Sequence, residues 1–293
     1  MEEKNEATAG LRAESPEADV ASAQGEDSPE ADVMSAQGTE SLGGDVTPAQ
    51  GAKLPEAGAA SAQGAESPKA LVLCSGGVDS TTLLAMAVER YGAENVFALS
   101  ISYGQKHARE IDSARAVAAH YGVQQRFLDL GVIFAESNCS LLAHSTEDVP
   151  AESYADQLAE SDGATVSTYV PFRNGLFLSA AASEALSLGC CALYYGAHHD
   201  DWAGSAYPDC SQAFVDAMAA AIAEGTGGEL RMEAPFVQWS KADIVREGLR
   251  LGVPYELTWS CYEGGERPCG VCATCIDRAR AFEANGTVDP LLR

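Results

Sequence analysis

Basic residues are scarce in this chain of 293 residues, which holds 18 Lys and Arg against 43 Asp and Glu and has a net charge of −25. The imbalance is not confined to one end, since residues 69–293 still hold 29 acids and 15 bases. An acidic domain repels a phosphate backbone, so this charge argues against a nucleic-acid partner. A small anion can still bind, because backbone N–H groups together with a magnesium ion supply local positive charge.

The sequence also lacks two kinds of targeting signal. No apolar run reaches the length of a membrane span, and the acidic start differs from the basic beginning of a secretory signal. The nine cysteines are odd in number and come without such a signal, which favours reduced thiols over disulfides. We therefore expect a cytoplasmic protein with no membrane partner.

The amino-terminal segment, residues 1–68, contains no aromatic residue and little Leu, Ile or Val. Its Gln-Gly pairs recur every 13 residues, beginning at Gln24, Gln37, Gln50 and Gln63. Such a segment cannot bury enough apolar area to offset chain entropy. We predict a disordered acidic repeat tail over residues 1–68, followed by one catalytic domain over residues 69–293. The role of the tail is left open.

A short apolar run followed by a glycine-rich turn begins the predicted domain. Leu71–Cys74 is typical of a buried parallel strand, Ser75–Gly77 of a tight turn, and a helical pattern starts at Val78. Free N–H groups and the helix dipole point at such a turn, and glycine lets a phosphate approach the backbone. No Gly-Lys-Ser/Thr follows, so this is not a Walker A loop. An ordinary strand-to-helix turn is the alternative.

Short apolar strands alternate with helical patterns through the rest of the chain. We predict strands over 96–102, 125–130, 192–196 and 231–236, and helices over 107–121, 176–188, 214–223, 241–251 and 276–284. This alternation predicts an α/β fold with a doubly wound, mostly parallel sheet. Ligands of such sheets collect beyond the carboxyl ends of the strands, where Ser75 and Tyr103 are expected. The acidic segment 140–167 is predicted to be a mobile crossover above the site.

Several charged residues follow the predicted strands or precede helices. Lys106 and His107 come after the second strand, and Arg173 lies just before a helix. These residues could contact a bound anion at the edge of the sheet. A charged residue at a helix start often only faces water, so this second interpretation stays open for all three. Asp201 and Asp209 follow the fourth strand and are candidate acceptors for the amine or ring N–H of a heterocycle. A metal site made from the adjacent His and Asp residues there is the weaker reading, because neighbouring side chains point in different directions.

The carboxyl end carries four cysteines spaced C-x7-C-x2-C-x2-C, namely Cys261, Cys269, Cys272 and Cys275. Tight C-x2-C turns let two thiolates reach one ion, and four sulfurs complete a tetrahedral zinc shell. A closed shell has no open position for water, so we expect one structural zinc ion per chain that holds the last helix against the body. An iron–sulfur cluster is the alternative.

These motifs together carry a resemblance to known enzymes. Residues 75–80 resemble the SGGxDS pyrophosphate loop of the ATP pyrophosphatases, and residues 70–283 as a whole resemble the 7-cyano-7-deazaguanine synthase family of queuosine biosynthesis. The matching stretches are SGGVDSTT at 75–82, YGQKH at 103–107, YVPFRN at 169–174, YPDC at 207–210, TWSCY at 258–262 and the four cysteines. The first motif alone is specific only to the superfamily.

The resemblance implies an adenine nucleotide α-hydrolase-like fold and an ATP-dependent, C–N bond-forming ligase. Such an enzyme converts 7-carboxy-7-deazaguanine and ammonia to a nitrile through adenylated intermediates, with magnesium and as a homodimer. It implies ATP binding by Cys74, Ser75, Gly76, Gly77, Val78, Asp79, Ser80, Thr81, Thr82, Leu83 and Leu84, with Asp79 near magnesium. The implied catalytic residues are Asp79, Lys106, His107 and Arg173. The implied substrate-binding residues are Tyr103, Asn174, Asp201, Tyr207 and Asp209.

The sequence departs from the family pattern at three places. Lys106 and Ser211 stand where Arg is common, and Ser205-Ala206 lengthens the link before Tyr207. The last two put the details of the substrate pocket in doubt. The alternatives are an enzyme that stops at the amide, one that amidates another carboxylate or thiolates tRNA, and a zinc-containing binding module without catalysis.

Overall fold

A parallel sheet of five strands organises the protein in the computed structural model, which describes residues 67–153, 156–157, 165–202 and 207–292. The strands are β1 (Lys69–Leu73), β2 (Val96–Ser102), β3 (Gln124–Asp129), β4 (Cys190–Tyr194) and β5 (Arg231–Glu233). Their order across the sheet is β3-β2-β1-β4-β5, and every neighbouring pair is parallel. The predicted doubly wound sheet is therefore confirmed.

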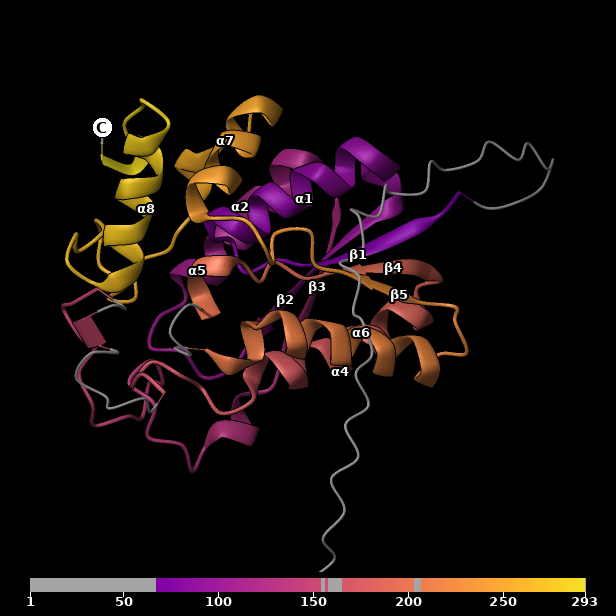
Figure 1. The fold of residues 1–293 in the computed structure, drawn as a ribbon, viewed down its shortest axis with the longest axis horizontal. Helices are drawn as coiled ribbons and strands as arrows, with labels where there is room; N and C mark the ends of the chain where they lie inside the picture. Colours follow the sequence, from indigo (N-terminus) through magenta and orange to yellow (C-terminus); the bar gives the residue numbers. More distant parts are fainter. Residues whose placement is uncertain (1–66, 154–155, 158–164, 203–206, 293) are drawn as a thin grey trace, which may run out of the picture. The chain divides into compact units, whose positions relative to one another are not determined.

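Alternation along the central strands explains why the sheet is covered on both faces. Leu71 and its register partner Leu193 face one apolar cluster, whereas Ala70 and Val72 face another. Helices α4 (Arg173–Ser187) and α6 (Gln212–Gly225) cover the first face. Helices α1 (Val78–Tyr91), α2 (Arg109–Tyr121) and α7 (Lys241–Leu251) cover the second, as Figure 1 shows.

The sheet changes its winding direction between β1 and β4. From β1 the chain proceeds outward through β2 to β3, and it then returns to β4 on the other side of β1 and proceeds to β5. At such a switch point the connections leave in opposite directions, so a crevice opens beyond the carboxyl ends of the two strands. The glycine-rich turn that joins β1 to α1 lies at this point.

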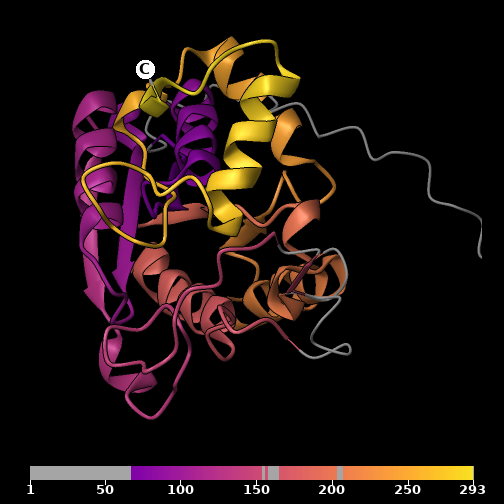
Figure 2. The same cartoon turned by 90° about the vertical axis from the view of Figure 1, so that its left-hand side faces the viewer.

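The carboxyl-terminal helix α8 (Ala273–Ala284) packs beside α7 (Figure 2). Tyr255 and Phe282 meet edge to face, with ring centroids 5.1 Å apart, among apolar residues of α1 and α7. On the same helix, the buried Arg278 makes an ion pair with Asp289 through both carboxylate oxygens, at 2.7 and 2.9 Å. These contacts fix α8 against the body of the domain.

Short helical turns and one four-residue helix connect these elements. They are η1 (Ala93–Asn95), η2 (Gly131–Phe134), α5 (His199–Trp202), η4 (Pro208–Cys210), η5 (Tyr255–Leu257) and η6 (Pro290–Leu292). None of the described helices is long and apolar enough to cross a membrane.

Some helices and strands begin at other residues than predicted, because the preceding turn sets where each one starts. The predicted strand 192–196 is observed two residues earlier, and the predicted helices at 176 and 276 begin three residues earlier, at Arg173 and Ala273. Phe172 precedes α4 with a φ of 51°, a left-handed conformation that no helical pattern reveals. Ser240 caps α7, since its side chain accepts the N–H of Asp243 in a capping box.

Two predictions lie wholly or largely outside the described residues. Of the predicted tail, residues 1–68, only the last two positions are described. The two residues that lengthen the link before Tyr207, Ser205 and Ala206, also lie outside the described residues. The predicted crossover 140–167 is described only in part. Its beginning is held to the β2–α2 connection by a bridge between Gln105 and Leu142 and by the Lys106 N–H, which donates to the Leu141 carbonyl at 2.9 Å.

Candidate active site

A cavity of about 260 Å³ opens at the carboxyl end of the sheet. The phosphate-binding candidate loop contributes Cys74, Ser75, Gly77, Val78, Asp79 and Ser80 to its wall. The other polar and charged residues of the wall include Tyr103, Gln105, Glu110, Arg173, Asn174, Asp201, Tyr207, Lys241, Ser260, Thr274 and Arg278. Segments from the beginning, middle and end of the domain therefore meet at one site.

The loop after β1 holds a compact, internally hydrogen-bonded shape. The Ser75 N–H donates to Ser80 Oγ at 3.2 Å, and the two hydroxyl oxygens lie 3.1 Å apart. Gly76 has a φ of 84°, and a Cβ there would clash with the backbone of Glu110 and Ala114 in α2. Glycine is therefore required at position 76, because the loop turns against the first turns of α2.

Not all the residues assigned to ATP by resemblance reach the cavity. Thr81, Leu83 and Leu84 are buried, and the Thr82 hydroxyl lies 2.8 Å from Tyr255 Oη behind the loop. None of these four side chains lines the cavity. They belong to the first turns of α1 and support the loop from below.

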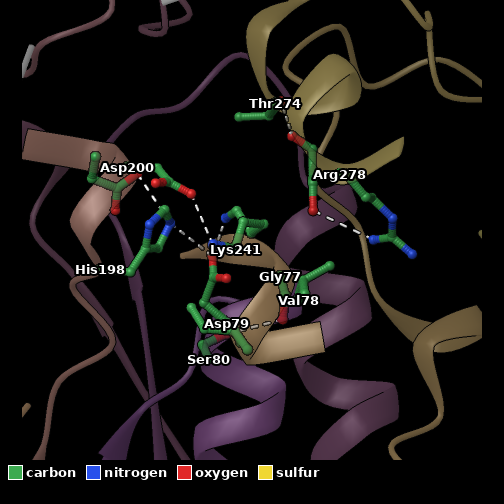
Figure 3. Close-up of polar contacts among 12 residues, drawn as sticks. Gly77, Val78, Asp79, Ser80, His198, Asp200, Lys241, Thr274 and Arg278 are labelled. Carbon is green, nitrogen blue, oxygen red and sulfur yellow. Dashed lines mark hydrogen bonds and ion pairs between the residues drawn. The ribbon is translucent and has the colours of Figure 1, made fainter. Parts of the chain in front are cut away.

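Asp79 forms the charged centre of the loop with Lys241, the first residue of α7. Lys241 Nζ donates to Asp79 Oδ2 at 2.6 Å, and Figure 3 shows both side chains converging with His198. Burial disfavours the Asp79 carboxylate, but the charges of Lys241 and His198 hold its pKa below the usual value. The second carboxylate oxygen, Oδ1, is buried without a hydrogen-bond partner among the described residues.

His198 lies behind this pair, at the end of the β4 connection. It is 2% exposed, and its Nε2 lies 3.2 Å from Asp201 Oδ1 and 3.7 Å from Asp79 Oδ2. The imidazole thus lies near the carboxylates of Asp79 and Asp201, and both of these residues line the cavity. The two carboxylates provide negative charge in the cavity wall, and the Lys241 ammonium, which is bonded to Asp79, provides positive charge beside them.

Arg173, the first residue of α4, also lines the cavity. Its guanidinium lies over the Tyr103 ring, 4.9 Å from the centroid, and 5.8 Å from that of Phe177. Burial alone would lower the pKa of Arg173, but the neighbouring Tyr103 and Asp209 raise it, so the group stays charged. Arg173 Nε has no hydrogen-bond partner among the described residues and is buried.

Glu110, in the first turn of α2, lines the same cavity and is near enough to Arg173 for their charges to interact. Burial raises its pKa to about 7, and the opposing charge of Arg173 only moderates this effect. The sequence showed this residue only as an acid at a helix start, where carboxylates are common.

Asn174, Asp209 and Tyr207 form a buried polar group beside Arg173. Asp209 Oδ2 accepts the Asn174 backbone N–H at 3.0 Å, and Tyr207 Oη lies 2.6 Å from Thr168 Oγ1. Burial raises the pKa of Asp209, against the effects of the Asn174 N–H and Arg173. Asn174 and Tyr207 line the cavity, whereas Asp209 lies behind them and positions the start of α4.

The structure does not bring Lys106 and His107 into the cavity wall. Lys106 is exposed, and its Nζ donates to the Glu147 carbonyl at 2.9 Å. His107 packs against Gly264, where a Cβ would clash with the imidazole ring. Their assignment as catalytic residues stays a prediction, and the residues of the same connection that do face the cavity are Tyr103 and Gln105.

The four predicted metal ligands come together. The Sγ atoms of Cys261, Cys269, Cys272 and Cys275 all lie within 4.8 Å of one another. Those of Cys269 and Cys275 are 3.9 Å apart, close to the roughly 3.8 Å edge of a tetrahedron with 2.3 Å metal–sulfur bonds. Backbone N–H groups of Cys269 and Cys272 donate to cluster sulfurs at 3.3 Å, which favours thiolates. The cluster fits one metal ion.

This cluster is joined directly to the cavity. The Trp259 N–H donates to the Gly76 carbonyl at 2.9 Å, two residues before Cys261. Thr274, in the first turn of α8 between Cys272 and Cys275, donates to the Ser260 carbonyl at 2.7 Å. Ser260, Thr274 and Arg278 consequently line the cavity, although no sequence motif marked Thr274 or Arg278 as site residues.

Lys241 is the most important residue that sequence reasoning missed. Its only signal was its place directly after a helix cap, and a lysine there normally faces water. It reaches Asp79, 162 positions earlier, because the first turns of α1 and α7 meet at the switch point.

Comparison with known proteins agrees with this geometry. Residues 69–286 match the model of the family described as queuosine biosynthesis protein QueC. The 7-cyano-7-deazaguanine synthase of Archaeoglobus fulgidus is 45% identical over 73% of this chain and 85% of that protein. Those of Caldicellulosiruptor bescii and Thermoplasma acidophilum are 43% and 40% identical, over 72% of this chain and 91% and 86% of theirs. With its loop, its switch-point cavity and its cysteine cluster, the chain belongs to the QueC family.

Proposed function

We propose that this protein makes 7-cyano-7-deazaguanine from 7-carboxy-7-deazaguanine and ammonia, using two molecules of ATP with magnesium. The observation that carries the proposal is the loop Ser75–Ser80. Its residues line a cavity at the carboxyl ends of β1 and β4. The names of the similar synthases give the product, 7-cyano-7-deazaguanine, and the family resemblance implies the substrates.

The chemistry explains why such a loop is needed. A carboxylate is a poor electrophile, but transfer of AMP to one oxygen creates a good leaving group, and ammonia then displaces AMP to give an amide. Adenylation of the amide oxygen followed by loss of AMP leaves the nitrile. No side chain has to act as a nucleophile, so catalysis depends on positioning and charge neutralisation.

The loop is suited to the departing pyrophosphate. Ser75, Gly77 and Ser80 present hydroxyl and N–H donors at the start of α1, where the helix dipole favours an anion. Asp79 keeps one carboxylate oxygen without a hydrogen bond, and this atom is the natural ligand for the magnesium that accompanies ATP. Lys241, bonded to the other oxygen, adds positive charge facing the phosphates.

We place the deazaguanine among Arg173, Asn174, Asp201 and Tyr207, which all line the cavity. Arg173 neutralises the substrate carboxylate, and Asp201 accepts N–H groups of the heterocycle. Asp209 acts through Asn174 rather than by direct contact, because its carboxylate holds the backbone at the start of α4. This is a refinement of the role that the resemblance implied.

We further propose that the metal of the cysteine cluster is zinc in a structural role. Four sulfurs leave no position for water, and the cluster lies behind the cavity wall rather than in it. The partners are then small molecules. The acidic charge disfavours tRNA, and a homodimer is expected from the family resemblance.

The test is incubation of the purified protein with ATP, magnesium, ammonium and 7-carboxy-7-deazaguanine, followed by mass spectrometry of the products. Nitrile with AMP and pyrophosphate is the expected result, and amide alone would identify an enzyme that stops halfway. Asp79→Asn should abolish turnover without changing bound zinc, whereas the exposed Asp112→Asn should retain activity. Release of ADP instead of AMP would contradict the proposal.

A further inference from the structure

Both halves of the proposed reaction must remove protons from nitrogen. Ammonia that has displaced AMP loses one proton to become the amide nitrogen. The adenylated amide then loses two more, the second as the third C–N bond forms and the C–O bond to AMP breaks. A base beside the reacting nitrogen would accelerate these steps, whereas the adenylation of the carboxylate itself transfers no proton.

The cavity wall contains few candidates for this base. Asp79 is bonded to Lys241 at 2.6 Å, and these charges lower its pKa, which makes it a weak base. Asp201 lies 3.2 Å from His198. The Asp209 carboxylate accepts the Asn174 N–H and does not line the cavity. Arg173 is already protonated and cannot accept another proton.

Glu110 is placed differently. It lines the cavity from the first turn of α2, and its carboxylate makes no hydrogen bond with another described residue. Its backbone packs against Gly76, so its position relative to the pyrophosphate loop is fixed by direct contact. In the adenylated intermediates of the proposed reaction, the reacting carbon is joined through one oxygen to the α-phosphate, the neighbour of the pyrophosphate that this loop would hold. The reacting nitrogen should therefore approach the same part of the cavity wall.

We propose, on the basis of the proposed function, that Glu110 is the general base that accepts the protons of the reacting nitrogen. In amide formation, the nitrogen lone pair makes the C–N bond, the C–O bond to AMP breaks, and a proton passes to the Glu110 carboxylate. In nitrile formation, Glu110 takes the last N–H proton, the released electron pair completes the triple bond, and AMP departs. Each proton then leaves for solvent.

The surroundings of Glu110 suit this role. The charged and titratable groups that face it are Arg173 from α4 and Tyr103 after β2. Burial keeps its pKa at about 7, so near neutral pH the group both accepts and releases a proton. Tyr103 is held un-ionised, since burial raises the pKa of its hydroxyl, and Arg173 stays charged.

The experiment separates proton removal from substrate binding. Full-length zinc-loaded protein is first assayed for carboxylate-dependent exchange of labelled pyrophosphate into ATP without ammonia, which reports the first adenylation alone. It is then given 7-amido-7-deazaguanine with ATP and magnesium, which isolates nitrile formation. Glu110→Gln and Glu110→Asp are compared with Asp112→Asn, which removes a charge from the same helical turn outside the cavity.

For Glu110→Gln we expect exchange within about threefold of wild type and nitrile formation reduced at least 100-fold, in the range of general-base effects. The rise in kcat with an apparent pKa near 7 should disappear in this variant, Glu110→Asp should recover part of the rate, and Asp112→Asn should behave as wild type. Loss of exchange together with nitrile formation in Glu110→Gln, or an unchanged pH profile, would overturn the proposal. Absence of carboxylate-dependent exchange in the wild type would instead refute the proposed function.

Discussion

The backbone N–H of Trp259 donates to the carbonyl of Gly76 at 2.9 Å, which ties the cysteine cluster to the loop at the centre of the cavity. Trp259 is nearly buried, and its indole N–H donates to the Cys261 carbonyl at 2.8 Å. A metal ion at Cys261 therefore stabilises the irregular segment 259–261, which contacts the loop. Metal binding and nucleotide binding should be coupled, although the metal lies outside the cavity.

Replacement of Cys275 by Ser should remove the metal and weaken nucleotide binding. We expect the Kd for an ATP analogue with a non-hydrolysable α,β bridge to rise at least tenfold, because the segment at Trp259 loses its anchor. Calorimetric titration and metal analysis measure the two effects. Cys191→Ser, in β4 and away from the cluster, is the control. An unchanged Kd in a metal-free Cys275→Ser protein would show that the coupling is absent.

Lys241→Met should destabilise the protein by about 2 kcal/mol at neutral pH, since it leaves the Asp79 carboxylate without its partner in a partly buried site. Lys241 helps to lower the pKa of Asp79 below its usual value of 3.8, so the stabilisation is present above that pH. It is lost as the pH falls through the lowered pKa. Urea unfolding of both proteins between pH 3 and pH 8 measures this, and a constant difference across the range would contradict it.

Glu110→Gln should make the protein without ligands less sensitive to alkaline pH. Burial raises the pKa of Glu110 from 4.5 to about 7, so the folded state binds more protons than the unfolded state between these values. With Glu110 present, the free energy of unfolding is highest below pH 4.5. It declines as the pH rises through 7, by at most about 3 kcal/mol. Unfolding midpoints at pH 5 and pH 8 should therefore differ less in Glu110→Gln than in the wild type or Asp112→Asn.

Asp289→Asn should be among the most destabilising single changes in α8 and its surroundings. It leaves the Arg278 guanidinium, whose side chain is 4% exposed, without a counter-charge, and we expect a loss of about 3–5 kcal/mol. Denaturant titration measures the loss. The exposed Glu283→Gln, on the same helix, should change stability by less than about 0.5 kcal/mol.

The fold and half of the site could be predicted from local pattern alone. Buried strands, the Ser75–Ser80 turn and the cysteine spacing are each encoded within a few residues, and the parallel sheet follows from their alternation. Lys241 and Arg278 could not be found in this way, because their contribution depends on α7 and α8 packing beside the loop. The sequence pattern of each helix indicates which of its faces is buried, but not which element packs against that face.

Lys106 and His107 are the opposite case, because the sequence predicted them at the site and they do not line the cavity. Their place after β2 correctly indicated the edge of the sheet where the cavity opens. Successive residues of an irregular connection point in different directions, however, and a sequence does not reveal which of them face inward. In this connection Tyr103 and Gln105 do so, while Lys106 reaches Glu147 and His107 packs under Gly264.

The wide separation of the loop from its backbone partner has a consequence for synthesis on the ribosome. Residues 75–80 leave the exit tunnel long before Trp259 and the cysteines have been translated. Until then the Gly76 carbonyl has no partner from that segment, and a shortened chain would expose the crevice without its last wall. A nascent or prematurely terminated polypeptide should therefore be unable to retain ATP.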